Sequence, residues 1–154
     1  MAETADVKVF QFESSSSSET IQVGRELAKL LEPPKFIILK GNLGTGKTTL
    51  VKGIAQALDA ADPDEVTSPT FTLIHEYEGT REGKPVLLYH LDLYRIEGER
   101  QLETLGLDDI TSPESIVLVE WGEKFKSVLK RANGEIRIEA AGGDTRRITV
   151  TLQS

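Results

Sequence analysis

The sequence predicts an α/β protein, built as a three-layer sandwich around a central, mostly parallel sheet and closed by a C-terminal β-hairpin. Short apolar runs alternate along the chain with segments of helical periodicity. The runs VLLYHLDLY and SIVLVEW are apolar almost throughout, which is typical of strands whose two faces are both buried. The 154 residues contain neither an internal repeat nor a long linker, so we expect one domain over residues 1–154.

The first half of the chain predicts two strands, each followed by a helix. Residues 7–12 have the composition of a strand, and a serine-rich segment then leads into a helix over residues 20–31, for which Ser18 is the expected N-cap. We interpret the serines as a flexible connector rather than a binding loop. Residues 33–41 predict a buried strand, and apolar side chains at four-residue spacing predict a helix over residues 47–58.

Strands and helices also alternate in the second half. An alternating strand follows Pro69, and a short helix that stops at Gly106 lies between the two apolar runs. Two alternating segments around the turn AGGDT predict the closing β-hairpin. The other expected strands cover residues 86–94, 115–121, 135–140 and 146–152. The short helix that stops at Gly106 lies within residues 97–110, and the last expected helix covers residues 122–132.

Composition excludes several classes of function. A net charge of −7 disfavours direct binding of nucleic acid, which requires clustered Lys and Arg, so we expect RNA to be met only through a partner. The absence of cysteine excludes disulfides, thiolate nucleophiles and Cys-ligated zinc, and two isolated histidines cannot hold zinc alone. No apolar stretch approaches the roughly 18 residues of a membrane span, and the acidic start does not resemble a secretory signal, so we expect a cytoplasmic protein without membrane contact.

The stretch GNLGTGKTT, between an expected strand and an expected helix, contains the phosphate-loop pattern GxxxxGK[ST]. Its glycines allow successive backbone N–H groups to converge on phosphates, and the start of a helix adds partial positive charge. Lys47 would reach the outer phosphates, and the hydroxyl of Thr48 would bind Mg²⁺. The pattern therefore predicts a P-loop NTPase-like fold in which the nucleotide contacts Gly41, Asn42, Leu43, Gly44, Thr45, Gly46, Lys47, Thr48 and Thr49.

Magnesium bound with phosphates needs a carboxylate from a neighbouring strand end, and the chain offers two. Asp92 ends VLLYHLD and Glu120 ends IVLVE, and the carboxyl ends of strands are where open α/β sheets bind ligands. Periodicity does not say which acid faces the metal, and either could instead cap a helix or pair with a base. We expect Thr48, Asp92 and Glu120 as metal ligands, and Lys47, Asp92 and Glu120 as catalytic residues.

Four other side chains have two readings each. Thr70, in TSPTFT, is a candidate hydroxyl that senses the outer phosphate, although a turn before a strand explains it as well. Arg95 could stabilise transition-state charge, but a surface ion pair is its commoner role. His90 is interpreted as a packed strand residue rather than a catalytic base. Trp121 is either a core residue at a helix start or a lid over the site.

The absence of two known motifs narrows the range of possible nucleotides and reactions. The sequence contains no NKxD, so guanine recognition of the usual GTPase type has no visible basis. It also contains no LSGGQ-like segment of the kind found in transporter ATPases. These absences leave a phosphate-loop nucleotide site with Mg²⁺, and ATP as the nucleotide is what the family resemblance described next implies.

Four motifs in this order and spacing, GNLGTGKTT, SPTFTLIHEY, YHLDLYR and LVEWGE, resemble the TsaE (YjeE) family of bacterial ATPases. The resemblance implies a small ATPase needed for threonylcarbamoyl (t6A) modification of adenosine 37 in tRNAs that read codons starting with A. It also implies TsaB and TsaD as protein partners. By position, Asp92 and Glu120 would flank the metal and the attacking water, Thr70 would lie in a switch-like loop, and Trp121 would lie beside the nucleotide.

Two other functions remain open from the residues alone. A small P-loop kinase could use Arg95 and Arg100 as lid arginines, although no pocket for a phosphate acceptor can be read from the sequence. A nucleotide-sensing binding module would use the same phosphate loop without depending on hydrolysis. Because the chain lacks a lid domain and a well-placed arginine finger, we expect an ATPase that is weak alone and stimulated by its partners.

Overall fold

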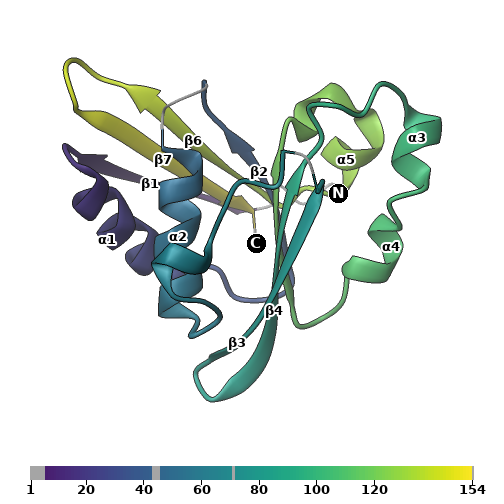
Figure 1. Ribbon diagram of the computed structural model, residues 1–154, viewed down its shortest axis with the longest axis horizontal. Coiled ribbons are helices and arrows are strands. Elements are labelled where there is room, and N and C mark those ends of the chain that lie inside the picture. Colours follow the sequence, from purple (N-terminus) through teal and green to yellow (C-terminus); the bar gives the residue numbers. More distant parts are fainter. Residues whose placement is uncertain (1–5, 43–45, 71, 154) are drawn as a thin grey trace.

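The computed structural model describes residues 6–42, 46–70 and 72–153, which form a seven-stranded sheet with helices on both faces (Figure 1). Leu43, Gly44 and Thr45 lie outside the described residues. The strands are β1 (Val7–Ser14), β2 (Lys35–Lys40), β3 (Ile74–Arg81), β4 (Lys84–Asp92), β5 (Ser115–Glu120), β6 (Gly134–Ala140) and β7 (Arg146–Gln153). The helices are α1 (Ser17–Ala28), α2 (Lys47–Ala57), α3 (Glu99–Glu103), α4 (Leu107–Ile110) and α5 (Lys126–Arg131), with 3₁₀ turns η1 (Pro63–Glu65) and η2 (Gly122–Lys124).

The strand order is β1-β7-β6-β2-β5-β4-β3. The four central strands β6, β2, β5 and β4 run parallel. Strands β3 and β7 pair antiparallel with the two sides of this group, and β1 pairs antiparallel with β7. Strand β5 is buried along its whole length, as its continuous apolar run predicts. The predicted sandwich with a mostly parallel centre and a C-terminal hairpin of β6 and β7 is confirmed.

Helices α1 and α2 cover one face of the sheet, and α3, α4 and α5 cover the other (Figure 1). Two glycines allow α1 and α2 to approach closely. A Cβ on Gly24 would lie 2.3 Å from the carbonyl oxygen of Leu50, and one on Gly53 would lie 2.0 Å from that of Ile21. Because any larger side chain would force the helices apart, these glycines allow α2 to pack closely against α1.

One hairpin was not expected from the sequence. Strand β4 begins at Lys84 and pairs antiparallel with β3 through a tight turn at Glu82 and Gly83. Both turn residues have positive φ angles, 54° and 80°, which suit the right-handed twist of a two-residue hairpin. The Glu-Gly pair is a weaker turn signal than Asn-Gly or Asp-Gly.

Three predicted helix limits are wrong. Ser16 rather than Ser18 caps α1, because the Ser16 hydroxyl oxygen accepts from the backbone N–H of Glu19 at 3.1 Å. The short helix expected to stop at Gly106 already ends at Glu103, and Gly106, with a φ of 71°, precedes a second short helix, α4. The helix expected over residues 122–132 is interrupted by the extended backbone of Phe125, whose ring packs into the core.

In the described parts of the chain, no helix combines the length and the apolar character that crossing a lipid bilayer requires.

Candidate functional site

The start of α2 lies directly beyond the carboxyl end of the central strand β2. Gly46 precedes the helix with a φ of 104°, a left-handed conformation that favours glycine. No side chain in the described ranges caps this helix start, so its first N–H groups are available to an anion. This is the placement that the phosphate-loop pattern predicts for Gly46, Lys47, Thr48 and Thr49.

The two strand-end acids lie side by side. Asp92 and Glu120 are register partners at the ends of the parallel strands β4 and β5, and both are 4% exposed. By strand alternation they share the face of Leu88 and Leu118, which belong to the core beneath α1 and α2. Both carboxylates therefore face the side of the sheet on which α2 lies. Periodicity in the sequence could not say which acid faces this side.

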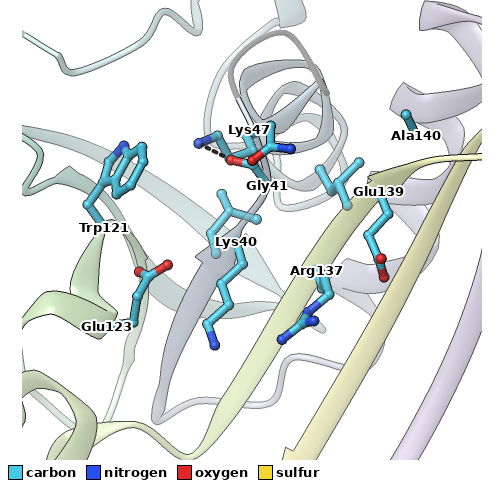
Figure 2. A pocket seen from close by; sticks show the side chains of 11 residues that line it. Lys40, Gly41, Lys47, Trp121, Glu123, Arg137, Glu139 and Ala140 are labelled. Carbon is cyan, nitrogen blue, oxygen red and sulfur yellow. Dashed lines mark hydrogen bonds between the residues drawn. The ribbon is translucent and has the colours of Figure 1, made fainter.

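Lys47 joins the phosphate loop to one of these acids. Its ammonium donates to the carbonyl oxygen of Gly41 at 2.8 Å, shown by the dashed line in Figure 2. It also forms an ion pair with Glu120, with 3.1 Å between Nζ and Oε1. The same ammonium lies 5.4 Å from the centre of the Trp121 ring. Three predicted site residues, Lys47, Glu120 and Trp121, are thus in contact.

Glu120 is held through its second oxygen by a histidine. His90 Nε2 lies 2.6 Å from Glu120 Oε2, and the His90 side chain is fully buried. Burial raises the pKa of the Glu120 carboxyl, but hydrogen bonding and charge interactions with His90 and Lys47 outweigh burial, so the net pKa is lowered. Glu120 is therefore an ionised carboxylate at neutral pH. The expectation that His90 is packed in the strand is confirmed, and its contact with Glu120 was missed.

Asp92 is held by the loop that contains Thr70. The Thr70 hydroxyl donates to Asp92 Oδ2 at 3.1 Å and also lies 2.8 Å from the Ser68 hydroxyl. The other oxygen, Oδ1, accepts from the backbone N–H of Tyr94 at 2.9 Å. The structure therefore brings Thr70 to the predicted metal ligand Asp92.

Two side chains that the sequence did not single out anchor this loop. Lys52, on α2, donates to the carbonyl oxygens of Pro63 at 2.6 Å and Val66 at 2.9 Å. His75, at the start of β3, contacts the Thr67 carbonyl oxygen at 3.1 Å. The loop before Thr70 is consequently tied both to the phosphate-loop helix and to the sheet.

Trp121 lies at the edge of the site rather than in the core. Its backbone φ is 63°, its exposed fraction is 36%, and its ring centre lies 5.2 Å from that of Tyr94. Lys124 ties this turn to the segment after β4, because its ammonium donates to the Tyr94 and Ile96 carbonyl oxygens, both at 2.9 Å. The interpretation of Trp121 as a core residue is therefore excluded.

Two cavities flank the start of α2. The first, of about 490 Å³, has Trp121 and Glu123 on one side and Arg137 and Glu139 on the other, with Lys47 between them (Figure 2). The second, of about 400 Å³, is formed by the serine-rich loop, the phosphate loop and the C-terminal hairpin. Its lining residues are Ser15, Ser16, Ser17, Thr20, Gly46, Thr49, Asp144 and Arg146.

The serine segment, interpreted from the sequence as a flexible connector, also lines the second cavity. Strand β1 pairs antiparallel with β7 so that Ser14 lies opposite Arg146, which brings the serine loop beside the hairpin turn. Ser16 is at once the cap of α1 and part of the cavity wall. No local signal in the sequence predicts that the serine loop lies beside the hairpin, because the pairing of β1 with β7 joins segments from the two ends of the chain.

Comparison with known proteins agrees with this geometry. The family model described as "Threonylcarbamoyl adenosine biosynthesis protein TsaE" matches residues 14–148. Proteins named tRNA threonylcarbamoyladenosine biosynthesis protein TsaE are similar to this chain. The one from Streptomyces coelicolor is 39% identical over 84% of this chain and 88% of its own length. The one from Bacillus subtilis is 37% identical over 94% and 87%, respectively.

A solved structure shows the same fold. The crystal structure of YdiB from Bacillus subtilis superposes with a TM-score of 0.69 at 30% sequence identity, covering 98% of this chain and 90% of that one. The match of sequence and fold extends over nearly the whole chain, including the phosphate loop and both acid-bearing strands. The chain therefore belongs to the TsaE family.

Proposed function

We propose that this chain, as one P-loop ATPase domain over residues 1–154, hydrolyses ATP with Mg²⁺ in support of t6A modification of tRNA in the cytoplasm. One observation supports the hydrolysis: Lys47, at the start of α2, contacts Glu120, which lies beside Asp92 at the carboxyl ends of the parallel strands. The tRNA process is the one that the names of the similar proteins state.

The described side chains fit phosphates and a magnesium ion. The start of α2 and the ammonium of Lys47 offer positive charge to phosphate oxygens. Asp92, Glu120 and Thr48 offer hard oxygen donors, which Mg²⁺ prefers. When bound, Mg²⁺ would neutralise the charge that develops on the phosphates.

In this proposal the contacts of Lys47 change when ATP binds. Its ammonium exchanges the Gly41 carbonyl and Glu120 Oε1 for phosphate oxygens. Glu120 Oε1 then becomes available to accept a hydrogen bond from the attacking water. Thr70, already hydrogen bonded to Asp92, lies where a loop can sense whether the outer phosphate is present.

The chain is proposed to act with homologues of TsaB and TsaD and to meet tRNA only through them. The net charge of −7 does not favour direct binding to RNA phosphates. Beside the site, Tyr94 and Trp121 are 59% and 36% exposed, and their rings lie against one another at an interplanar angle of 54°. Exposed aromatic pairs of this kind suit a protein partner that covers the site.

The test is phosphate release by this chain alone, with the TsaB–TsaD pair of the same organism, and with the pair plus tRNA. We expect a slow rate alone, stimulation of tenfold or more by the pair, and no tRNA binding by the lone chain at physiological salt. A fast rate that the pair leaves unchanged would contradict the partner-dependent mechanism. If t6A formation proceeds fully with a nonhydrolysable ATP analogue, the chain is a nucleotide sensor rather than an ATPase.

A further inference from the structure

His90 is a buried polar side chain that the proposed hydrolysis does not itself use. It lies on β4 in register with Leu118 of β5, and its exposed fraction is 0%. Strand alternation places it between Leu88 and Asp92 on the face that α1 and α2 cover. Its polar contact is with Glu120, at 2.6 Å from Nε2 to Oε2.

The contacts of the imidazole assign its proton. Nε2 faces a carboxylate oxygen, so Nε2 carries hydrogen and donates it. Nδ1 is buried and has no hydrogen-bond partner among the described residues. A carboxylate oxygen can only accept, so the hydrogen bond between the two side chains is donated by Nε2.

Packing does not account for an imidazole at this position. The neighbouring positions on the same face of β4 and β5, Leu88 and Leu118, are apolar and fully buried. A leucine in place of His90 would avoid the desolvation of two ring nitrogens, one of which has no hydrogen-bond partner within the described ranges. The imidazole is therefore explained by what it does to Glu120.

Glu120 uses its two oxygens for different partners. Oε1 contacts Lys47, and Oε2 contacts His90. If Lys47 turns to the phosphates when ATP binds, the hydrogen bond from His90 still holds the carboxylate. We propose that His90 is a positioning residue, which fixes the Glu120 carboxylate so that Oε1 stays aimed at the site where water attacks. This inference rests on the proposed ATPase function.

The first experiment compares His90→Leu, which removes the donor, with His90→Gln, whose side-chain N–H can replace it. Leu88→Ala, two residues earlier on the same face, is the control for lost packing. Turnover is measured with the TsaB–TsaD pair, and ATP affinity is followed by the fluorescence of Trp121, the single tryptophan. We expect kcat of His90→Leu to fall by about tenfold or more with ATP affinity changed less than about threefold, and His90→Gln to recover most of the loss.

In the same measurements, Leu88→Ala is expected to lower the melting temperature but to leave kcat within about twofold, because it does not touch Glu120. In a Glu120→Ala background, His90→Leu should cause no further loss, since a residue that acts through Glu120 has nothing left to position. Additive losses, or a normal kcat in His90→Leu while Lys47→Ala is inactive, would overturn the inference.

A second measurement does not depend on activity. In the NMR spectrum of the nucleotide-free protein, we expect a slowly exchanging imidazole proton on His90 Nε2 that is absent in His90→Leu and shifted in Glu120→Gln. A ring protonated on Nδ1 alone, or a signal that Glu120→Gln leaves unmoved, would overturn the positioning role. If the wild-type protein shows this signal and yet does not hydrolyse ATP under any condition, the proposed function fails while the contact stands.

Discussion

Lys47 and Glu120 form an ion pair that joins the phosphate loop to the end of β5, with 3.1 Å between Nζ and Oε1 and side-chain exposures of 11% and 6%. Both charges are largely removed from water, so each depends on the other in the absence of phosphate. In the proposed function, a nucleotide phosphate competes with Glu120 for the same ammonium. Binding of ATP and release of Glu120 would then be a single exchange of partners.

Lys47→Ala should abolish ATP hydrolysis, with a loss of about a hundredfold or more, while the fold survives. The change removes the charge that holds the outer phosphates but leaves β2 and α2 intact. Lys40→Ala is the matched control, because Lys40 lines the same cavity but pairs with Glu135 at 2.9 Å. Phosphate release and circular dichroism on both variants check this. Wild-type hydrolysis by Lys47→Ala would refute the phosphate-loop interpretation.

Asp92→Ala and Glu120→Ala should both reduce activity but in different ways. Asp92, which Thr70 contacts, is expected to hold Mg²⁺, so its loss should weaken Mg²⁺-dependent ATP binding by about tenfold or more. Loss of Glu120 should slow turnover, while ATP binding is largely kept. Titration of Mg²⁺ and ATP against Trp121 fluorescence, beside steady-state kinetics, separates the two. Normal turnover in either variant would return that acid to a structural role.

The ionised Glu120 carboxylate should stabilise the fold in a pH-dependent way. Its pKa in the folded protein is lowered from the ordinary value of 4.5, so the unfolded chain binds the proton more tightly than the folded protein does. The stabilisation is then fully present above the unfolded pKa and is lost as pH falls through the folded pKa. Urea unfolding of wild type and Glu120→Gln should give a free-energy difference that is constant near neutral pH and shrinks below about pH 4.5. A difference that does not change down to pH 3 would contradict the lowered pKa.

Thr70→Val should slow hydrolysis by about tenfold while ATP binding changes little, because it removes the hydroxyl next to Asp92 and keeps the side-chain shape. Thr72→Val is the control: it lies in the same loop, but its hydroxyl contacts His75 at 2.7 Å. Single-turnover kinetics with saturating ATP distinguish the chemical step from binding. Equal hydrolysis rates for the two variants would mean that Thr70 only stabilises the turn before β3.

Local patterns in the sequence determined the α/β class, the strand, turn and helix around Lys47, and the two acids that end apolar strands. These features depend on residues that are near each other in the chain, such as the glycines before a helical period. The order of the four motifs also identified the TsaE family, which the family match confirms. Helix limits were less well determined, because Ser16 and Ser18 are equally good caps when only the local sequence is read.

The tertiary structure alone decided which of these features meet. The pairing of β4 with β5 places Asp92 beside Glu120 and brings His90 into contact with the Glu120 carboxylate. The pairing of β1 with β7 brings the serine loop to Arg146. A strand's own sequence reports which residues alternate between its faces, but not which strand lies next to it or in which register. That choice depends on burying apolar surface and pairing backbone groups across the whole sheet, so it is settled only when the chain has folded.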